Sequence, residues 1–77
     1  MALVTKLEKT EINARVHGKV EADYNIVIKD GKKYLQINTY GSEHRKENKV
    51  SQTIQFNEES AKQLIKIIKN ELGINLN

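Results

Sequence analysis

Four polar side chains occupy alternate positions near the middle of the chain: Tyr34, Gln36, Asn38 and Tyr40. Alternate residues of an extended strand point to the same side, so these four would form one row of two aromatic rings and two amides. Aromatic rings stack on the bases of single-stranded nucleic acid, and amides make adaptable hydrogen bonds to base edges. The alternative interpretation is a solvent-facing sheet surface without a ligand, because tyrosine and polar residues are common on such surfaces.

Basic residues flank this row in the sequence. Three lysines precede it closely, and three further cations follow it in the polar run 42–49, which we expect to be an exposed loop. Such cations could hold the phosphates on either side of stacked bases. The predicted nucleic-acid-binding residues are therefore Tyr34, Gln36, Asn38, Tyr40, Lys33, Arg45, Lys46 and Lys49.

The start of the polar run suggests a second kind of site. Backbone amides after Gly41, together with Ser42 and Arg45, could bind a phosphate or a carboxylate. The segment lacks the further glycines of a Walker loop or a dinucleotide-binding motif. An ordinary solvated loop is the simpler interpretation, so a nucleotide or small-molecule sensor is our third functional hypothesis.

Catalysis has little support in the sequence. His17 and His44 fall in different predicted turns, and neither has the partner spacing of a zinc motif. Ser42, Glu43 and His44 are neighbours in sequence, whereas a nucleophile and its base must converge in space. The chain contains no cysteine, which excludes disulfides and thiolate metal sites. We expect a non-enzymatic protein with no catalytic residue, no metal site and no cofactor.

The 77 residues are expected to form a single domain, 1–77. A chain of this length buries only about 60% of the surface that its unfolded form exposes, and only 38% of its residues are hydrophobic. The core should therefore be thin, and we expect a second subunit to complete it in a homodimer. The N-terminus lacks the apolar run of a signal peptide, and no segment approaches the ~20 apolar residues of a membrane span. These features favour a cytoplasmic protein without a membrane partner.

A first hairpin is predicted ahead of the polar row. Apolar and polar residues alternate over 12–16 and again over 20–28. A three-residue loop at 17–19 places the apolar residues of both runs on one face, whereas a two-residue loop would set Ala14 against Glu21. We therefore predict two antiparallel strands joined by a three-residue loop.

The dipeptide Asp30-Gly31 predicts a second hairpin, because a type I′ turn needs positive φ at both of its central residues. A two-residue loop sets apolar residues against apolar ones along most of the two strands, and polar against polar. The predicted pairs are Lys29 with Lys32, Ile28 with Lys33, Val27 with Tyr34, Ile26 with Leu35, Asn25 with Gln36, and Tyr24 with Ile37.

The last third of the chain predicts a strand and then a helix. Residues 50–56 alternate between two faces, and Asn57 is a suitable N-cap for the segment that follows. Apolar residues recur at helical spacing over 58–72, and Gly73 can end the helix in the left-handed conformation. The predicted buried stripe of this helix consists of Ala61, Leu64, Ile65, Ile68 and Leu72.

These elements predict an α+β fold with a four-stranded antiparallel sheet in the order β-β-β-β-α and one C-terminal helix packed on one face. The sheet would span 12–56 and the helix 58–72. Residues 1–9 fit one side of a helical turn as well as a frayed strand, and we treat them as an extension outside the sheet.

Three apolar residues fall outside the predicted buried stripe of the helix, namely Ile67, Ile74 and Leu76. We predict that they form the dimer interface. The alternative is a wide apolar helix face with the C-terminal tail folded over the helix end.

The predicted order of four strands and one helix, with basic loops and a polar sheet face, resembles the single-stranded-DNA-binding domain of the transcriptional coactivator positive cofactor four and its small bacterial relatives. The resemblance covers roughly residues 12–72. It implies a dimer formed through the helix and the sheet edge, with DNA lying along the strands. The positions that it would carry over are Tyr34, Tyr40, Lys33, Arg45 and Lys46.

Residues 34–42 and 51–56 are also similar to short uncharacterised bacterial and phage proteins, a similarity that implies no function. Our first hypothesis is a small protein that binds single-stranded DNA or RNA through the polar row and the basic loops. The alternative is a phage or bacterial regulator that binds a protein partner, as an inhibitor for example, through the exposed sheet.

Overall fold

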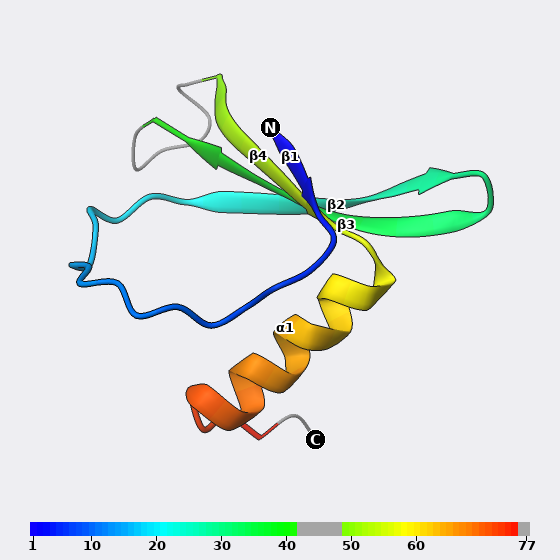
Figure 1. The fold of residues 1–77 in the computed structure, drawn as a ribbon. Helices are drawn as coiled ribbons and strands as arrows, with labels where there is room; N and C mark the ends of the chain where they lie inside the picture. The colour runs from blue at the N-terminus through cyan, green and yellow to red at the C-terminus, as the bar shows by residue number, and fades with distance from the viewer. Residues whose placement is uncertain (42–48, 76–77) are drawn as a thin grey trace.

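The computed structural model describes residues 1–41 and 49–75. Its elements in this part of the chain are β1 (Ala2–Val4), β2 (Ala22–Lys29), β3 (Lys32–Tyr40), β4 (Val50–Phe56) and α1 (Glu58–Glu71). The strands form one sheet in the order β1-β4-β3-β2, and α1 lies on one side of it (Figure 1). The predicted α+β fold, with a four-stranded sheet and a C-terminal helix, is confirmed.

The sheet is mixed, so the prediction of a wholly antiparallel sheet is wrong. β1 runs parallel to β4, with Ala2 opposite Ile54 and Val4 opposite Phe56. Ala2–Val4 therefore belongs to the sheet and is not an extension outside it. A contact with the helix holds this strand in place, because the Ser60 hydroxyl donates a 2.6 Å hydrogen bond to the carbonyl of Val4.

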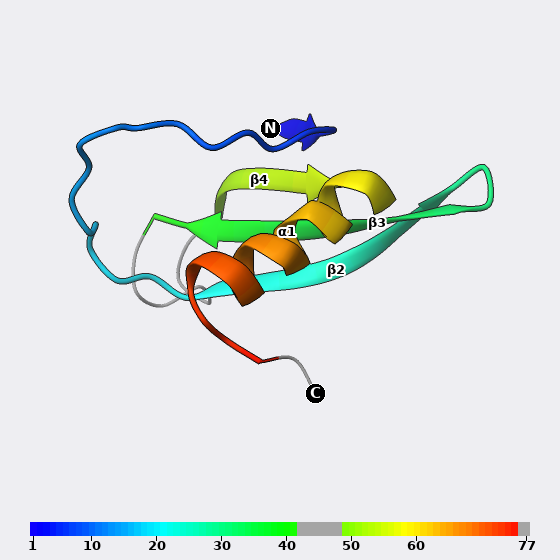
Figure 2. The same ribbon diagram turned by 60° about the horizontal axis from the view of Figure 1, so that its bottom comes forward.

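The strand predicted at 12–16 is absent, because residues 5–21 have no regular secondary structure. Residues 8–22 are exposed throughout, and this segment forms a wide connection between β1 and β2 in Figure 2. The physical reason is that no helix covers the sheet on the far side of β2 in the described part of the chain. A strand beyond β2 would need cover for its apolar residues, whereas α1 contacts β3 and β4.

The β2–β3 hairpin has the predicted register at every pair from Lys29 opposite Lys32 to Tyr24 opposite Ile37. Its two-residue turn has positive φ at both Asp30 (53°) and Gly31 (76°), as a type I′ turn requires. The local turn chemistry therefore fixes the register of these two strands.

β3 pairs with β4 in antiparallel fashion, with Leu35 opposite Phe56 and Ile37 opposite Ile54. These side chains share the face on which α1 lies, because directly opposite residues point to the same side. Among the apolar residues that the structure describes, only Phe56 is buried, with 7% of its surface exposed. The core is thin, as the composition predicts.

α1 begins with a capping box at the predicted N-cap. The Ser60 amide donates to Asn57 Oδ1 at 2.9 Å, and the Asn57 amide donates to Ser60 Oγ at 3.1 Å. The helix ends before Gly73, whose φ is +70°, as expected of a left-handed stop. Figure 1 shows that its first turn lies nearest the strands. Ile65 and Leu72, which the helical spacing predicts to be buried, are exposed.

The N-terminal segment continues from β1 along the helix. The backbone amide of Leu7 donates to Gln63 Oε1 at 2.7 Å, and Lys9 forms an ion pair with Glu71 at 3.1 Å. Residues 1–9 are therefore joined to both the sheet and α1.

Candidate functional site

The side of the sheet opposite α1 carries a continuous set of polar side chains from three strands. We call this set the polar face; its members are Asp23 and Asn25 from β2, Tyr34, Gln36, Asn38 and Tyr40 from β3, and Thr53 and Gln55 from β4. The four residues of the predicted row lie together on it. Their placement follows from strand periodicity alone, because alternate residues of β3 share a face.

A chain of hydrogen bonds crosses the polar face and ends at one carboxylate. Gln55 Nε2 donates to Gln36 Oε1 at 2.8 Å, and Gln36 Nε2 donates to Asn38 Oδ1 at 2.9 Å. Asn38 Nδ2 then donates to Asp23 Oδ1 at 2.8 Å. The other carboxylate oxygen of Asp23 accepts from the Tyr40 hydroxyl at 2.7 Å.

The carboxylate of Asp23 sets the direction of this chain. An ionised carboxylate only accepts hydrogen bonds, so Asn38 must present its NH₂ group to Asp23 and its carbonyl oxygen to the other side. That oxygen accepts from Gln36 and, at 3.2 Å, from the hydroxyl of Thr53. Each amide in the chain therefore has one preferred orientation.

Asn38 is the centre of the network and is 9% exposed, although it lies on the side of the sheet away from the helix. A second acceptor for its NH₂ group is Asn25 Oδ1 at 3.2 Å. The described residues contain no buried side-chain nitrogen or oxygen without a hydrogen-bond partner. The members of the polar face other than Tyr34 thus orient one another through hydrogen bonds in the free protein.

The predicted basic residues are placed differently from one another. Lys33 lies opposite Ile28 on the helix side of the sheet, away from the polar face. Lys49 is exposed just before β4. Arg45 and Lys46 lie outside the described residues, and so does Leu76. Ile67 and Ile74 are described and exposed, but they do not belong to the polar face.

Two of the three lysines expected near the phosphates, Lys29 and Lys32, lie opposite each other next to the turn, on the same side of the sheet as Tyr34. One charged residue of this face, Asp23, was missed from the sequence. It lies opposite Asn38 in the middle of the face. The signal for Asp23 was available, because the predicted hairpin register, continued by one pair, already places it on this side.

The charges of the polar face are therefore separated along the strands. Asp23 disfavours a phosphate in the centre, whereas Lys29 and Lys32 at the hairpin end are exposed and favour one there. Lys49 supplies a further exposed cation close to the start of β4. A strand of nucleic acid on this face would place its bases over the network and its phosphates nearer the lysines.

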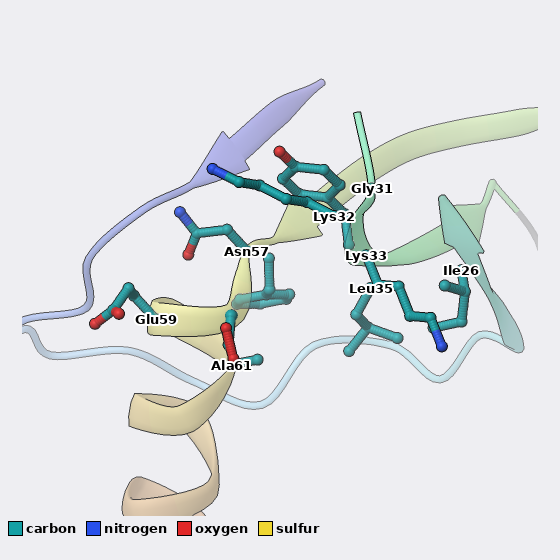
Figure 3. A pocket seen from close by; sticks show the side chains of 11 residues that line it. Ile26, Gly31, Lys32, Lys33, Leu35, Asn57, Glu59 and Ala61 are labelled. Carbon is teal, nitrogen blue, oxygen red and sulfur yellow. The ribbon is translucent and has the colours of Figure 1, made fainter. Parts of the chain in front are cut away.

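A groove lies where the β2–β3 hairpin extends past the end of β4. It has a volume of about 610 Å³, and Figure 3 shows Lys32, Lys33 and Leu35 on the hairpin side and Asn57, Glu59 and Ala61 on the helix side. Its lining combines apolar side chains with charges of both signs. The carboxylates in this lining, Glu58 and Glu59, disfavour a polyanion in the groove.

Comparison with protein-family models, with curated proteins and with solved structures gave no match to this chain. The resemblance to positive cofactor four domains therefore stays a prediction. Among the described residues, no three histidine, cysteine, aspartate or glutamate side chains are grouped so that they could hold a metal ion. In the same part of the chain, no helix has the length and apolar character needed to span a membrane.

Proposed function

We propose that this protein binds single-stranded nucleic acid, DNA or RNA, on the polar face, without catalysing a reaction. The observation that supports this proposal best is the row from Tyr34 to Tyr40, in which the hydrogen-bond network orients Gln36, Asn38 and Tyr40. Tyr34 and Tyr40 are partly exposed and lie at the two ends of the row. Rings at these positions would stack on bases, and the amides between them would contact base edges.

The network lowers the cost of binding in this proposal. Ordering a long polar side chain at an interface costs roughly 0.5–1.5 kcal/mol. Gln36, Asn38 and Tyr40 are already held by hydrogen bonds in the free protein. A ligand on this face therefore meets oriented groups and does not have to order them.

Fluorescence anisotropy with a labelled oligothymidine at low and moderate salt tests the proposal. We expect binding that weakens as salt rises, because lysines near the phosphates release counterions when they bind. Binding that is absent at tens of micromolar protein, or that does not change with salt, contradicts the proposal. A labelled duplex of the same length is the matched ligand control, since stacked bases in a duplex cannot reach the tyrosines.

A second candidate function is a protein-interaction module that uses the helix side of the sheet. The observation in its favour is the exposure of Tyr24 (72%), Ile26 (51%) and Ile28 (67%) on that side, next to the groove of mixed charge. Purification from a nuclease-treated extract distinguishes the two candidates. A partner protein that stays bound at fixed stoichiometry after nuclease treatment favours this function, and loss of the bound material on nuclease treatment favours nucleic acid.

A further inference from the structure

β2 is an edge strand whose outer side has no neighbour in the described sheet, because β3 is its only paired strand. In a two-residue hairpin the pair that flanks the turn exchanges both of its hydrogen bonds. That pair is Lys29 and Lys32, so the odd-numbered residues of β2 bond to β3. The backbone N–H and C=O groups of Ala22, Tyr24, Ile26 and Ile28 therefore point outward.

This edge has few of the features that commonly prevent strand pairing, which are a proline, a bulge, a very short strand or charged side chains. β2 has eight residues, no proline and no bulge. Its two charged residues, Asp23 and Lys29, lie near its two ends. Three of the residues whose backbone groups point outward also have exposed apolar side chains on the helix side of the sheet: Tyr24, Ile26 and Ile28.

We propose that the outer edge of β2 binds β2 of a second copy of this chain in antiparallel fashion, with Ile26 opposite Ile26 on a two-fold axis. The pairing would form one continuous eight-stranded sheet from two four-stranded ones. It brings together backbone groups that point outward in both copies, as an antiparallel ladder requires. The proposal does not depend on nucleic-acid binding.

The side chains of β2 match those of β2 in a second copy, which supports a second copy as the partner at this edge. On the helix side, the two-fold at Ile26 sets Tyr24 of each copy opposite Ile28 of the other. All three exposed apolar residues of the edge then meet apolar residues across the axis. An aromatic ring opposite a β-branched residue is a favourable cross-strand pair.

On the polar side, the same register sets Asp23 of each copy opposite Lys29 of the other, and Asn25 opposite Val27. Opposite charges at directly facing positions stabilise a pair of strands, and they occur here twice by symmetry. Shifting the axis by one residue removes this match. An axis at Asn25 sets Asp23 against Val27, and an axis at Val27 sets Tyr24 against Asp30 in the turn.

The pairing also enlarges the polar face. Directly opposite residues point to the same side of a sheet, so the polar faces of both copies would lie on one side of the dimer. This interface differs from the one predicted at Ile67, Ile74 and Leu76, which involves the helix and the C-terminal tail.

Cysteine cross-linking tests the register directly, because the chain has no cysteine of its own. The Cα atoms of a hydrogen-bonded antiparallel pair lie about 5.5 Å apart, within the range that a disulfide bridges. Mild oxidation of the Ile26→Cys variant should therefore give a covalent dimer. Tyr24→Cys is the matched control, since its two copies would lie four residues apart along the strands, roughly 13 Å, and should stay unlinked.

Sedimentation velocity over a wide concentration range tests the dimer itself. We expect the mass of a dimer for the natural sequence, and a rise of at least about 100-fold in the dimer dissociation constant for Ile26→Lys, which sets two like charges opposite each other. Ile12→Lys is the control, because Ile12 is exposed in the segment between β1 and β2. Circular dichroism of each variant separates loss of dimer from loss of folding.

Three results would overturn the proposal. One is a monomer at every concentration, and the second is equal cross-linking of the Tyr24→Cys and Ile26→Cys variants. The third is a dimer that Ile67→Lys dissociates and Ile26→Lys leaves intact, which would place the interface on the helix.

Discussion

Asn38 and Asp23 face each other across β3 and β2, and the Asn38 amide donates a 2.8 Å hydrogen bond to the Asp23 carboxylate. The Asn38 side chain also accepts from two neighbours on β3 and β4, so it joins all three strands of the polar face. Asn38 is 9% exposed on an otherwise open sheet face. Its hydrogen bonds therefore both stabilise the sheet and orient the neighbouring side chains.

Asn38→Ala should lower the free energy of unfolding by about 1–3 kcal/mol, because it leaves partly buried donors and acceptors without their partner. Urea denaturation followed by circular dichroism measures this change. Asn13→Ala is the matched control, since Asn13 is exposed outside the sheet, and it should alter the free energy of unfolding by less than about 0.5 kcal/mol. Equal effects of the two substitutions would show that the network does not stabilise the sheet.

Ser60→Ala should lower the free energy of unfolding by about 1–3 kcal/mol as well. Ser60 is fully buried, and its hydroxyl joins the capping box to the Val4 carbonyl. Because this contact holds β1 against the helix, hydrogen exchange of amides in β1 should accelerate more than exchange in β2. Ser51→Ala, at an exposed position of β4, is the control. Unchanged exchange in β1 would contradict the assigned role of Ser60.

The β2–β3 hairpin was predictable pair by pair because its determinants are local. Asp30 and Gly31 supply the two positive φ angles, and a two-residue loop leaves one register. The row from Tyr34 to Tyr40 then follows from strand periodicity. Asp23 could have been placed by the same reasoning, because the hairpin register continued by one pair sets it opposite Asn38.

The parallel pairing of β1 could not be read from the sequence in this way. It depends on a contact between Val4 and Ser60, which are 56 positions apart, and no local pattern announces such a contact. At 12–16 a strand was predicted where the structure has none. Alternation shows which side chains a strand would bury, but it does not show whether a second layer exists to cover them.

Tyr34→Ala and Tyr40→Ala should each weaken oligothymidine binding by roughly 1–3 kcal/mol, the typical contribution of one stacked base. Gln52→Ala is the control, because Gln52 is exposed on the helix side of the same sheet, opposite Thr39 and away from the β2 edge. Anisotropy titrations at one salt concentration measure all three variants. Loss of binding in the Gln52 variant alone would place the nucleic acid on the helix side of the sheet and contradict the proposal.

Tyr40 needs one further variant, because its hydroxyl is bonded to Asp23. Tyr40→Phe keeps the ring and removes this bond. If stacking is the main contribution of Tyr40, the phenylalanine variant should bind oligothymidine much more tightly than the alanine variant does. Equal loss in both variants would instead assign the effect to the hydrogen bond and its orientation of the network.

Lys32 and Lys33 are neighbours in sequence on opposite sides of the sheet, which makes them a matched pair for locating the phosphates. Lys32→Ala should weaken binding to all single-stranded sequences and reduce the slope of log K against log salt by about 0.7, the value for one phosphate contact on a single strand. Lys33→Ala should change both quantities less than Lys32→Ala does, because its side chain starts from the helix side, although both lysines line the groove. If Lys33→Ala reduces the slope and Lys32→Ala does not, the nucleic acid binds on the helix side and the polar face is not the site.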